Sequence, residues 1–146
     1  MCGVEEGIAR TKLEQEPAER FVALRQQLGV TSFGLNQIVM ACGERGRIHR
    51  HEHQEEVYLV LEGQLTLLVE GQPHELVVGE LIRVAPGLRR QLVNRGPGRL
   101  VMLALGGARE HHGRDGEAFT SWDATAGAPP QQTPLPANLS PDELRA

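Results

Sequence analysis

Three histidines lie within five residues of this chain, at His49, His51 and His53, and the carboxylate of Glu56 follows them. Imidazole and carboxylate groups ligate divalent first-row metals, and two imidazoles with one carboxylate leave open positions for a substrate. Alternate residues of a β-strand face the same side, so His49 and His51 are expected to point into one site. Glu56 begins the next apolar run and completes a candidate metal-binding group.

The surrounding residues predict the strands that must position this group. Short apolar runs alternate with Gly, Asn and Pro turns, which is typical of closely spaced strands. The runs cover residues 35–41, 56–61, 64–69, 74–78, 81–84, 90–93 and 100–105, and residues 118–122 add one short candidate. Because no helical pattern separates the runs, βαβ units are excluded and an antiparallel sandwich or barrel is expected.

The segments before and after these strands have a different character. Phe21, Leu24 and Leu28 recur at helical spacing after Pro17, which predicts a short amphipathic helix that ends at Gly29. We therefore expect an N-terminal arm and helix over residues 1–30, a barrel over 31–108 and a polar, proline-rich extension over 109–146. That extension either lies against the barrel or a neighbouring subunit, with Leu135 and Leu139 as anchors, or is disordered.

The composition argues against several classes of partner. The chain has 146 residues, and 15 Lys and Arg against 19 Asp and Glu give a net charge of −4. No basic field attracts a phosphate backbone, and aromatic residues make up only 3% of the chain, so no nucleic-acid partner is expected. No apolar run is long enough to span a membrane, and the first twelve residues do not resemble a signal peptide. A cytoplasmic protein without a membrane partner is expected.

The spacing around the histidine pair resembles the first conserved motif of the cupin superfamily. That motif has a glycine, a His-x-His pair after five residues, a glutamate after three or four more, and a glycine after six more. Gly43, His49, His51, Glu56 and Gly63 match it at every position. The resemblance implies an all-β fold, a single antiparallel cupin barrel, which is a double-stranded β-helix or jelly roll. It also implies a homodimer, as small cupins commonly pair their sheets, and an outward apolar face at Val57, Leu59 and Leu61 agrees with one.

The second cupin motif is also recognisable, but it departs from the family at the last metal ligand. Gly79, Pro86, Gly87 and Asn94 match this motif, whereas Arg90 stands where the family has a histidine. A guanidinium offers only donors and stays protonated, so Arg90 cannot ligate a metal. Either Arg90 binds an anionic substrate beside a metal ion, or it pairs with Glu56 in a metal-free barrel.

Two further residues belong to the candidate site. His53 shares the parity of the histidine pair and could replace the missing ligand, although the chain must bend before Glu56. Tyr58 shares a face with Glu56, and it either acts as a general acid or packs in the barrel with its hydroxyl bonded to a neighbour. A third interpretation leaves the histidines as a solvated strand edge without function.

These observations predict a barrel that binds a small, anionic molecule together with a divalent metal held by His49, His51 and Glu56. Imidazole and carboxylate suit Fe, Mn, Ni, Zn and Cu alike, so the sequence does not select the metal. A metal-dependent oxygenase or isomerase is one functional hypothesis. The alternative is a metal-free ligand-binding or sensor barrel in which Arg90 replaces the histidine ligand. The substrate and the catalytic residues are left open, because one fold carries many chemistries.

Overall fold

The fold is described from a computed structural model that covers residues 7–108 and 115–145. Its elements in chain order are β1 (Phe21–Val22), α1 (Leu24–Leu28), β2 (Gly34–Met40), β3 (Ile48–His51), β4 (Glu55–Glu62), β5 (Gln64–Val69), β6 (Gln72–Val77), β7 (Leu81–Val84), β8 (Arg90–Val93), β9 (Leu100–Gly107) and β10 (Gly116–Phe119). Two single-turn 3-10 helices follow, η1 (Pro130–Gln132) and η2 (Pro141–Glu143). Residues 1–6 of the expected arm and residues 109–114 and 146 of the expected extension lie outside the described ranges.

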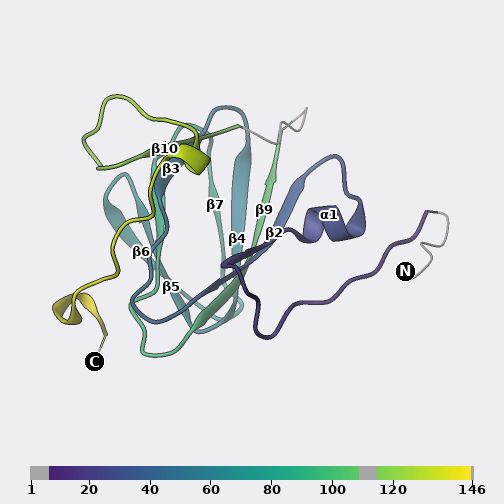
Figure 1. The fold of residues 1–146 in the computed structure, drawn as a ribbon, viewed down its shortest axis with the longest axis horizontal. Helices are drawn as coiled ribbons and strands as arrows, with labels where there is room; N and C mark the ends of the chain where they lie inside the picture. The colour runs from purple at the N-terminus through teal and green to yellow at the C-terminus, as the bar shows by residue number, and fades with distance from the viewer. Residues whose placement is uncertain (1–6, 109–114, 146) are drawn as a thin grey trace.

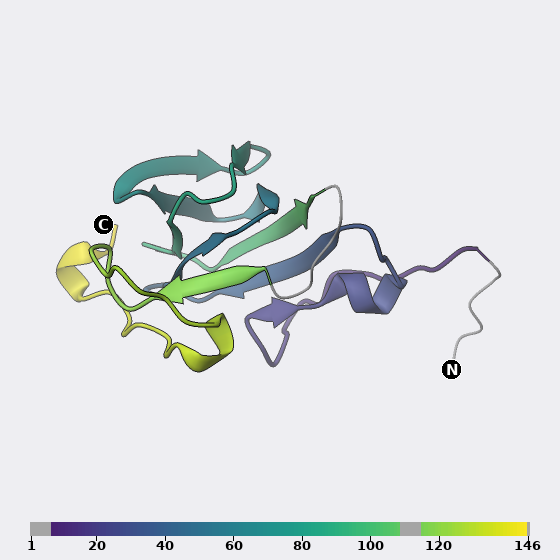
Figure 2. The ribbon, with the colours of Figure 1, turned by 90° about the horizontal axis from the view of Figure 1, so that it is seen from above.

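The strands form two antiparallel sheets (Figure 1). One sheet has the order β1-β2-β9-β4-β7 and the other has the order β10-β3-β8-β5-β6, so consecutive strands repeatedly cross from one sheet to the other. The expected all-β antiparallel cupin barrel is therefore confirmed. Figure 2 shows the two sheets from above, with the described N-terminal arm running away from the body of the molecule.

The core lies between the two sheets and follows from the period-two pattern of the strands. In β4, Tyr58 and Val60 are buried while Val57 and Leu59 are half-buried on the opposite face, as the alternation predicts. The buried cluster takes members from both sheets: Ile38, Met40, Tyr58, Val60, Leu65, Leu67, Leu76, Val84, Leu92, Leu100, Met102 and Ala104. The polar candidate site thus lies at one end of a closely packed apolar interior.

The turn between β4 and β5 explains the last glycine of the first motif. Gly63 has φ +77°, a left-handed conformation that costs a residue with a Cβ. A Cβ at this position would also lie 2.2 Å from the carbonyl oxygen of Arg99. Glycine therefore allows the chain to pass at this point from β4 in one sheet to β5 in the other.

The N-terminal helix is present but shorter than the apolar spacing predicts. It begins at Leu24 rather than near Pro17, and it ends at Gly29, which adopts the expected left-handed conformation. Phe21 and Val22 are extended instead, because they pair with Ile38 and Gln37 of β2. Backbone pairing with the sheet has overridden the helical period of this segment.

Both terminal segments contribute to the barrel. β1 extends the first sheet, while β10 pairs with β3 at the edge of the second and covers residues 116–119 rather than 118–122. The following tail lies against the loop between β2 and β3, where the amide of Leu139 donates to the Gly43 carbonyl and the Arg45 guanidinium donates to the Ala137 carbonyl. Leu135 is half-exposed, so backbone contacts hold much of this segment.

Within the described part of the chain, no helix has the length and hydrophobicity that crossing a membrane requires.

Candidate metal centre and ligand pocket

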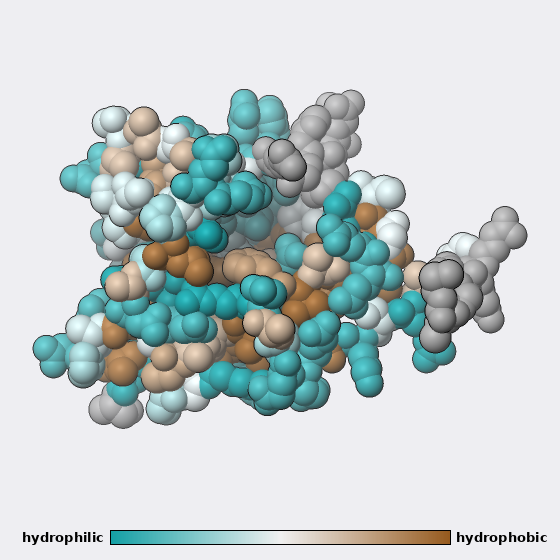
Figure 3. Space-filling view, in the orientation of Figure 1, coloured by the Kyte–Doolittle hydropathy of each residue, from teal (hydrophilic) through white to brown (hydrophobic). Residues whose placement is uncertain are grey.

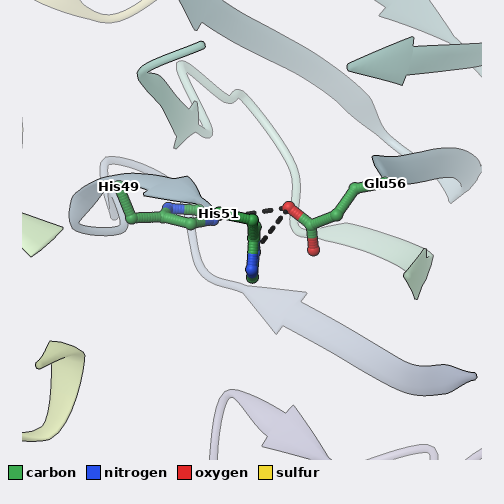
Figure 4. A group of neighbouring side chains, drawn as sticks. All are labelled: His49, His51 and Glu56. Atoms are coloured by element: carbon green, nitrogen blue, oxygen red, sulfur yellow. Dashed lines mark ion pairs between the residues drawn. The ribbon is translucent and has the colours of Figure 1, made fainter. Parts of the chain in front are cut away.

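The barrel brings together the three residues that the motif selects. His49 and His51 lie on β3 in one sheet, and Glu56 lies on β4 in the other. Their Nε2 atoms are 3.5 and 3.1 Å from the same carboxylate oxygen, Oε1 of Glu56. Figure 4 shows both imidazoles turned toward this oxygen, with ring centroids 5.4 Å apart and planes nearly perpendicular. The three groups thus converge on one point.

The spacing of these atoms fits a metal ion. Two ligands at about 2.1 Å from one ion lie roughly 3.0 to 3.4 Å apart at octahedral or tetrahedral angles. The observed separations of 3.1 and 3.5 Å lie close to this range. One donor atom from each residue lies within 4.8 Å of the others.

The outer nitrogens of the two imidazoles indicate which atoms face the carboxylate. Nδ1 of His49 lies 3.2 Å from the carbonyl oxygen of Arg47, which only accepts, so that nitrogen carries a proton. Nδ1 of His51 is buried without a hydrogen bond and faces Oδ2 of Asp115 at 3.7 Å, another acceptor. In neutral imidazoles the Nε2 lone pairs then point at Glu56. With both imidazoles neutral, three acceptors face one another, and a cation between them would satisfy all three. With a proton on each Nε2, the two imidazoles instead donate to Glu56.

Glu56 is held in its ionised form. Burial raises the pKa of this carboxyl. Hydrogen bonds and charge from His49 and His51 lower it by more, so the pKa lies well below its usual range. A carboxylate that stays ionised suits either a metal ion or a cationic partner.

Arg90 reaches the site from β8 but does not open toward the ligand space. Its Nη1 donates to Oε1 of Glu56 at 2.8 Å and its Nη2 donates to the Ala85 carbonyl at 2.7 Å. The side chain is completely buried, and its Nε has no hydrogen bond within the described residues. The guanidinium thus pairs with Glu56 and the backbone, which is one of the two arrangements expected for Arg90, and its role in binding a substrate stays a prediction.

Tyr58 also donates to Glu56. Its hydroxyl lies 2.6 Å from Oε1, and the ring is fully buried among the core residues. Burial, followed by the charge of Glu56, raises the pKa of Tyr58 well above its ordinary value. The phenol therefore stays protonated and holds the carboxylate in place.

His53 does not join this group. β3 ends at His51, and the bend that follows leaves the His53 side chain 57% exposed with Nδ1 2.9 Å from Oδ1 of Asp115. The hydrogen bond to Asp115 raises the pKa of His53. His53 would face the site as a fourth ligand only if β3 continued to it, but the strand ends two residues earlier.

Asp115 is a site residue that the sequence did not single out. Its side chain accepts from the amides of His53 and Gln54, both at 2.9 Å, as well as from His53 Nδ1. Burial raises the pKa of Asp115, but these hydrogen bonds lower it by more. Asp115 immediately precedes β10, so only the unexpected start of that strand could have indicated its position.

A pocket opens from the metal-binding group toward the outside of the barrel. A cavity of ≈ 550 Å³ extends from His51 and Glu56 to Asn36, Arg25 on α1, and the η1 segment of the tail. A smaller space of ≈ 200 Å³ adjoins it and reaches Tyr58 and Leu92. The register of β2 settles the ambiguity at its start, since Asn36 lines the pocket while Gln37 is bonded to the backbone of Glu14.

Figure 3 shows the face of the molecule between the C-terminal tail and α1. Hydrophobic side chains gather across its middle, with hydrophilic side chains on both sides. Phe21 and Leu135, which line the smaller space, are both partly exposed. The two terminal segments therefore form walls of the ligand space.

Comparisons with known proteins agree with this architecture. The family model of the cupin domain matches residues 36–106. A cupin protein from Bacteroides fragilis is 21% identical with a TM-score of 0.64, over 82% of this chain and 97% of the other. A sugar phosphate isomerase of the cupin superfamily from Silicibacter pomeroyi is 22% identical with a TM-score of 0.62, over 94% of this chain and 99% of the other. No curated protein is similar enough to count as a match.

Residues 36–106 match the cupin domain, and the described chain has the cupin fold.

Proposed function

We propose that this cupin binds a small anionic molecule in the barrel pocket, beside a divalent metal ion held by His49, His51 and Glu56. The observation that carries the proposal is the convergence of two imidazole Nε2 atoms and one carboxylate oxygen, with the outer imidazole nitrogens facing acceptors. Protons on both Nε2 atoms would instead place two imidazolium ions and Arg90 around one carboxylate.

The charges at this site favour an anion as the ligand. A divalent ion and the Arg90 guanidinium together carry three positive charges, and Glu56 neutralises only one of them. Because like charges repel strongly in a partly buried site, a bound anion stabilises the metal and Arg90 together. A carboxylate or phosphate oxygen supplies that charge and fills an open coordination position.

The reaction classes that suit this site are a metal-dependent oxygenation or an isomerisation. A bound metal ion would polarise a substrate oxygen. His49 and His51 keep Glu56 ionised, while hydrogen bonds from Arg90 and Tyr58 hold its carboxylate in place. Two solved structures of similar fold, from Silicibacter pomeroyi and Acidithiobacillus ferrooxidans, are described as a sugar phosphate isomerase and a putative one. Their likeness supports isomerisation as the first activity to assay.

Elemental analysis of untagged protein tests the metal site. We expect about one equivalent of a first-row metal per chain after loading and dialysis, and its loss in His49→Ala. His74→Ala is the matched control, because His74 lies exposed on β6, away from the site. Equal metal content in His49→Ala and the wild type, or no uptake of Fe, Mn, Ni, Zn or Cu by the wild type, would contradict the proposal.

A metal-free sensor or ligand-binding barrel is the second candidate function. It is favoured by the two donors that already occupy Oε1 of Glu56, the Arg90 guanidinium at 2.8 Å and the Tyr58 hydroxyl at 2.6 Å. Metal uptake by Arg90→His but not by the wild type would support it, since that variant restores the histidine of the family motif.

We also propose that the chain forms a homodimer through the outer face of the first sheet. Val57 and Leu59 of β4 lie opposite Leu105 and Leu103 of β9 on this face, and all four are half-buried in the single chain. Leu81 of β7, opposite Leu59, is 62% exposed. Such a continuous apolar face suits burial against a second copy of the same sheet.

A further inference from the structure

We propose that Arg25 recognises the anionic group of the ligand and that this ligand is a polyhydroxylated small molecule, a sugar acid or a sugar phosphate. This inference rests on the proposed binding function and adds the residue and the substrate class. It follows from the charges and amides that line the pocket beyond the metal-binding group.

Arg25 is a cation with no counter-ion in the described structure. It lies on α1 and lines the same cavity as His51 and Glu56. Its Nε is buried without a hydrogen-bond partner, and no carboxylate of residues 7–108 or 115–145 lies within ion-pair distance. A guanidinium that has lost part of its hydration gains most from a bidentate carboxylate or phosphate.

The other charged groups in the cavity already have partners. Glu56 is bonded to Arg90, and Asp115 accepts from His53 and two backbone amides. Arg47, at the adjoining smaller space, donates through Nε to the Thr133 carbonyl and so holds the tail. Arg25 is therefore the cation on the pocket wall that is best placed for an anion, a role that the sequence assigned to Arg90.

Unengaged amides surround the path from Arg25 to the metal-binding group. Asn36 of β2, Gln26 of α1, and Gln131 and Gln132 of η1 line the cavity, and none of these side chains makes a hydrogen bond to another described residue. A side-chain amide both donates and accepts, which matches the hydroxyl group of a polyol. A ligand with several hydroxyls and one terminal anionic group would use both features.

Isothermal titration with D-gluconate, glucose 6-phosphate, inorganic phosphate and neutral glucose tests the inference. We expect gluconate or glucose 6-phosphate to bind the metal-loaded wild type, and glucose to bind much more weakly. Arg25→Gln should weaken that binding at least about tenfold, since one charge-assisted contact is lost. Arg10→Gln is the matched control and should stay within about twofold, because Arg10 is exposed on the N-terminal arm.

Comparing gluconate with glucose 6-phosphate shows whether the ligand carries a carboxylate or a phosphate. Binding of gluconate alone would identify a sugar acid, and binding of glucose 6-phosphate alone a sugar phosphate. Asn36→Ala should weaken binding of the hydroxylated ligand and leave binding of inorganic phosphate unchanged. This result separates recognition of the hydroxyls from recognition of the charge. Thermal unfolding of each variant, compared with the wild type, shows that the fold is retained.

Three results would overturn the inference. The first is equal affinity of Arg25→Gln and the wild type for gluconate or glucose 6-phosphate. The second is binding of glucose as tight as that of gluconate or glucose 6-phosphate, and the third is no binding of either hydroxylated anion. Failure of the metal proposal gives a different signature. In that case the wild type takes up no metal, while the dependence of anion binding on Arg25 is unchanged.

Discussion

A single carboxylate oxygen organises the candidate site. Oε1 of Glu56 lies within 3.5 Å of donor or ligand nitrogens from His49, His51 and Arg90, and it accepts from Tyr58. These four residues come from three strands, so the carboxylate links the two sheets at the polar end of the core. Each partner can be removed separately, which makes their contributions measurable.

Removal of the Tyr58 hydroxyl should destabilise the barrel without changing its packing. Tyr58→Phe keeps the buried ring but deletes a hydrogen bond to a charged acceptor, so the free energy of unfolding should fall by about 1.5 to 3 kcal/mol. Urea denaturation of the metal-free protein measures this change. An unaltered midpoint would mean that the hydroxyl does not hold Glu56.

Removal of the Arg90 guanidinium should lower the free energy of unfolding by more than removal of the Tyr58 hydroxyl. Arg90→Met leaves a buried carboxylate without its ion-pair partner, and the expected loss of stability in metal-free protein is about 3 to 5 kcal/mol. Arg83→Met is the control, because its exposed pair with Glu55 should contribute less than about 1 kcal/mol. Added metal should restore part of the stability of Arg90→Met, since a cation can replace the guanidinium. Similar losses in both arginine variants would contradict this account.

At the scale of the elements, the strand pattern could be read from the sequence while the segment boundaries could not. Alternation placed His49, His51, Glu56 and Tyr58 on the inward faces, because a period of two leaves little freedom once the core is known. The position of the His53 side chain depends on where β3 ends, and the start of α1 depends on where β1 ends. Tertiary pairing of the strands decides both. Asp115 and Arg25 reach the site from distant segments, and no local pattern marks such contacts.

The C-terminal tail offers a test of a local capping motif at η2. At η2, Ser140 donates through its amide and hydroxyl to Oε1 of Glu143, and these bonds lower the pKa of Glu143. The contribution of a carboxylate with a lowered pKa is present above the usual carboxyl pKa and is lost as pH falls through the folded value. Protection of the Leu139 amide, which is bonded to Gly43, should therefore decrease at acidic pH.

Hydrogen exchange corrected for intrinsic rates measures this protection. In Glu143→Gln the capping acceptor remains but the titrating charge is gone, so the protection of Leu139 should lose its acidic pH dependence. Identical pH profiles of the variant and the wild type would show that another carboxylate controls the tail.

At the scale of the whole molecule, the uncovered outer face of the first sheet predicts the oligomeric state. The described N-terminal arm reaches β2, where Gln37 bonds to the backbone of Glu14, while the β9 and β4 side of the face keeps its apolar side chains. The proposed dimer would cover this side.

A charge at the centre of this face should prevent dimer formation. Leu103→Asp places a carboxylate among Leu59 and its neighbours, so the mass from light scattering should fall from two chains to one. Val77→Asp, on the exposed edge strand β6, is the control and should remain dimeric. Circular dichroism distinguishes a folded monomer from an unfolded chain. A monomeric wild type would contradict the proposal.

The residues that line the pocket come from two parts of the chain, one inside and one outside the match to the cupin family model. The candidate metal ligands lie within residues 36–106, the part that matches the cupin family model, whereas Arg25, Gln131 and Gln132 lie outside it. The centre that would perform chemistry and the surface that would select its substrate are thus encoded in separable stretches of sequence. Substitutions in the terminal segments could redirect this barrel to a new ligand while its metal-binding group stayed intact.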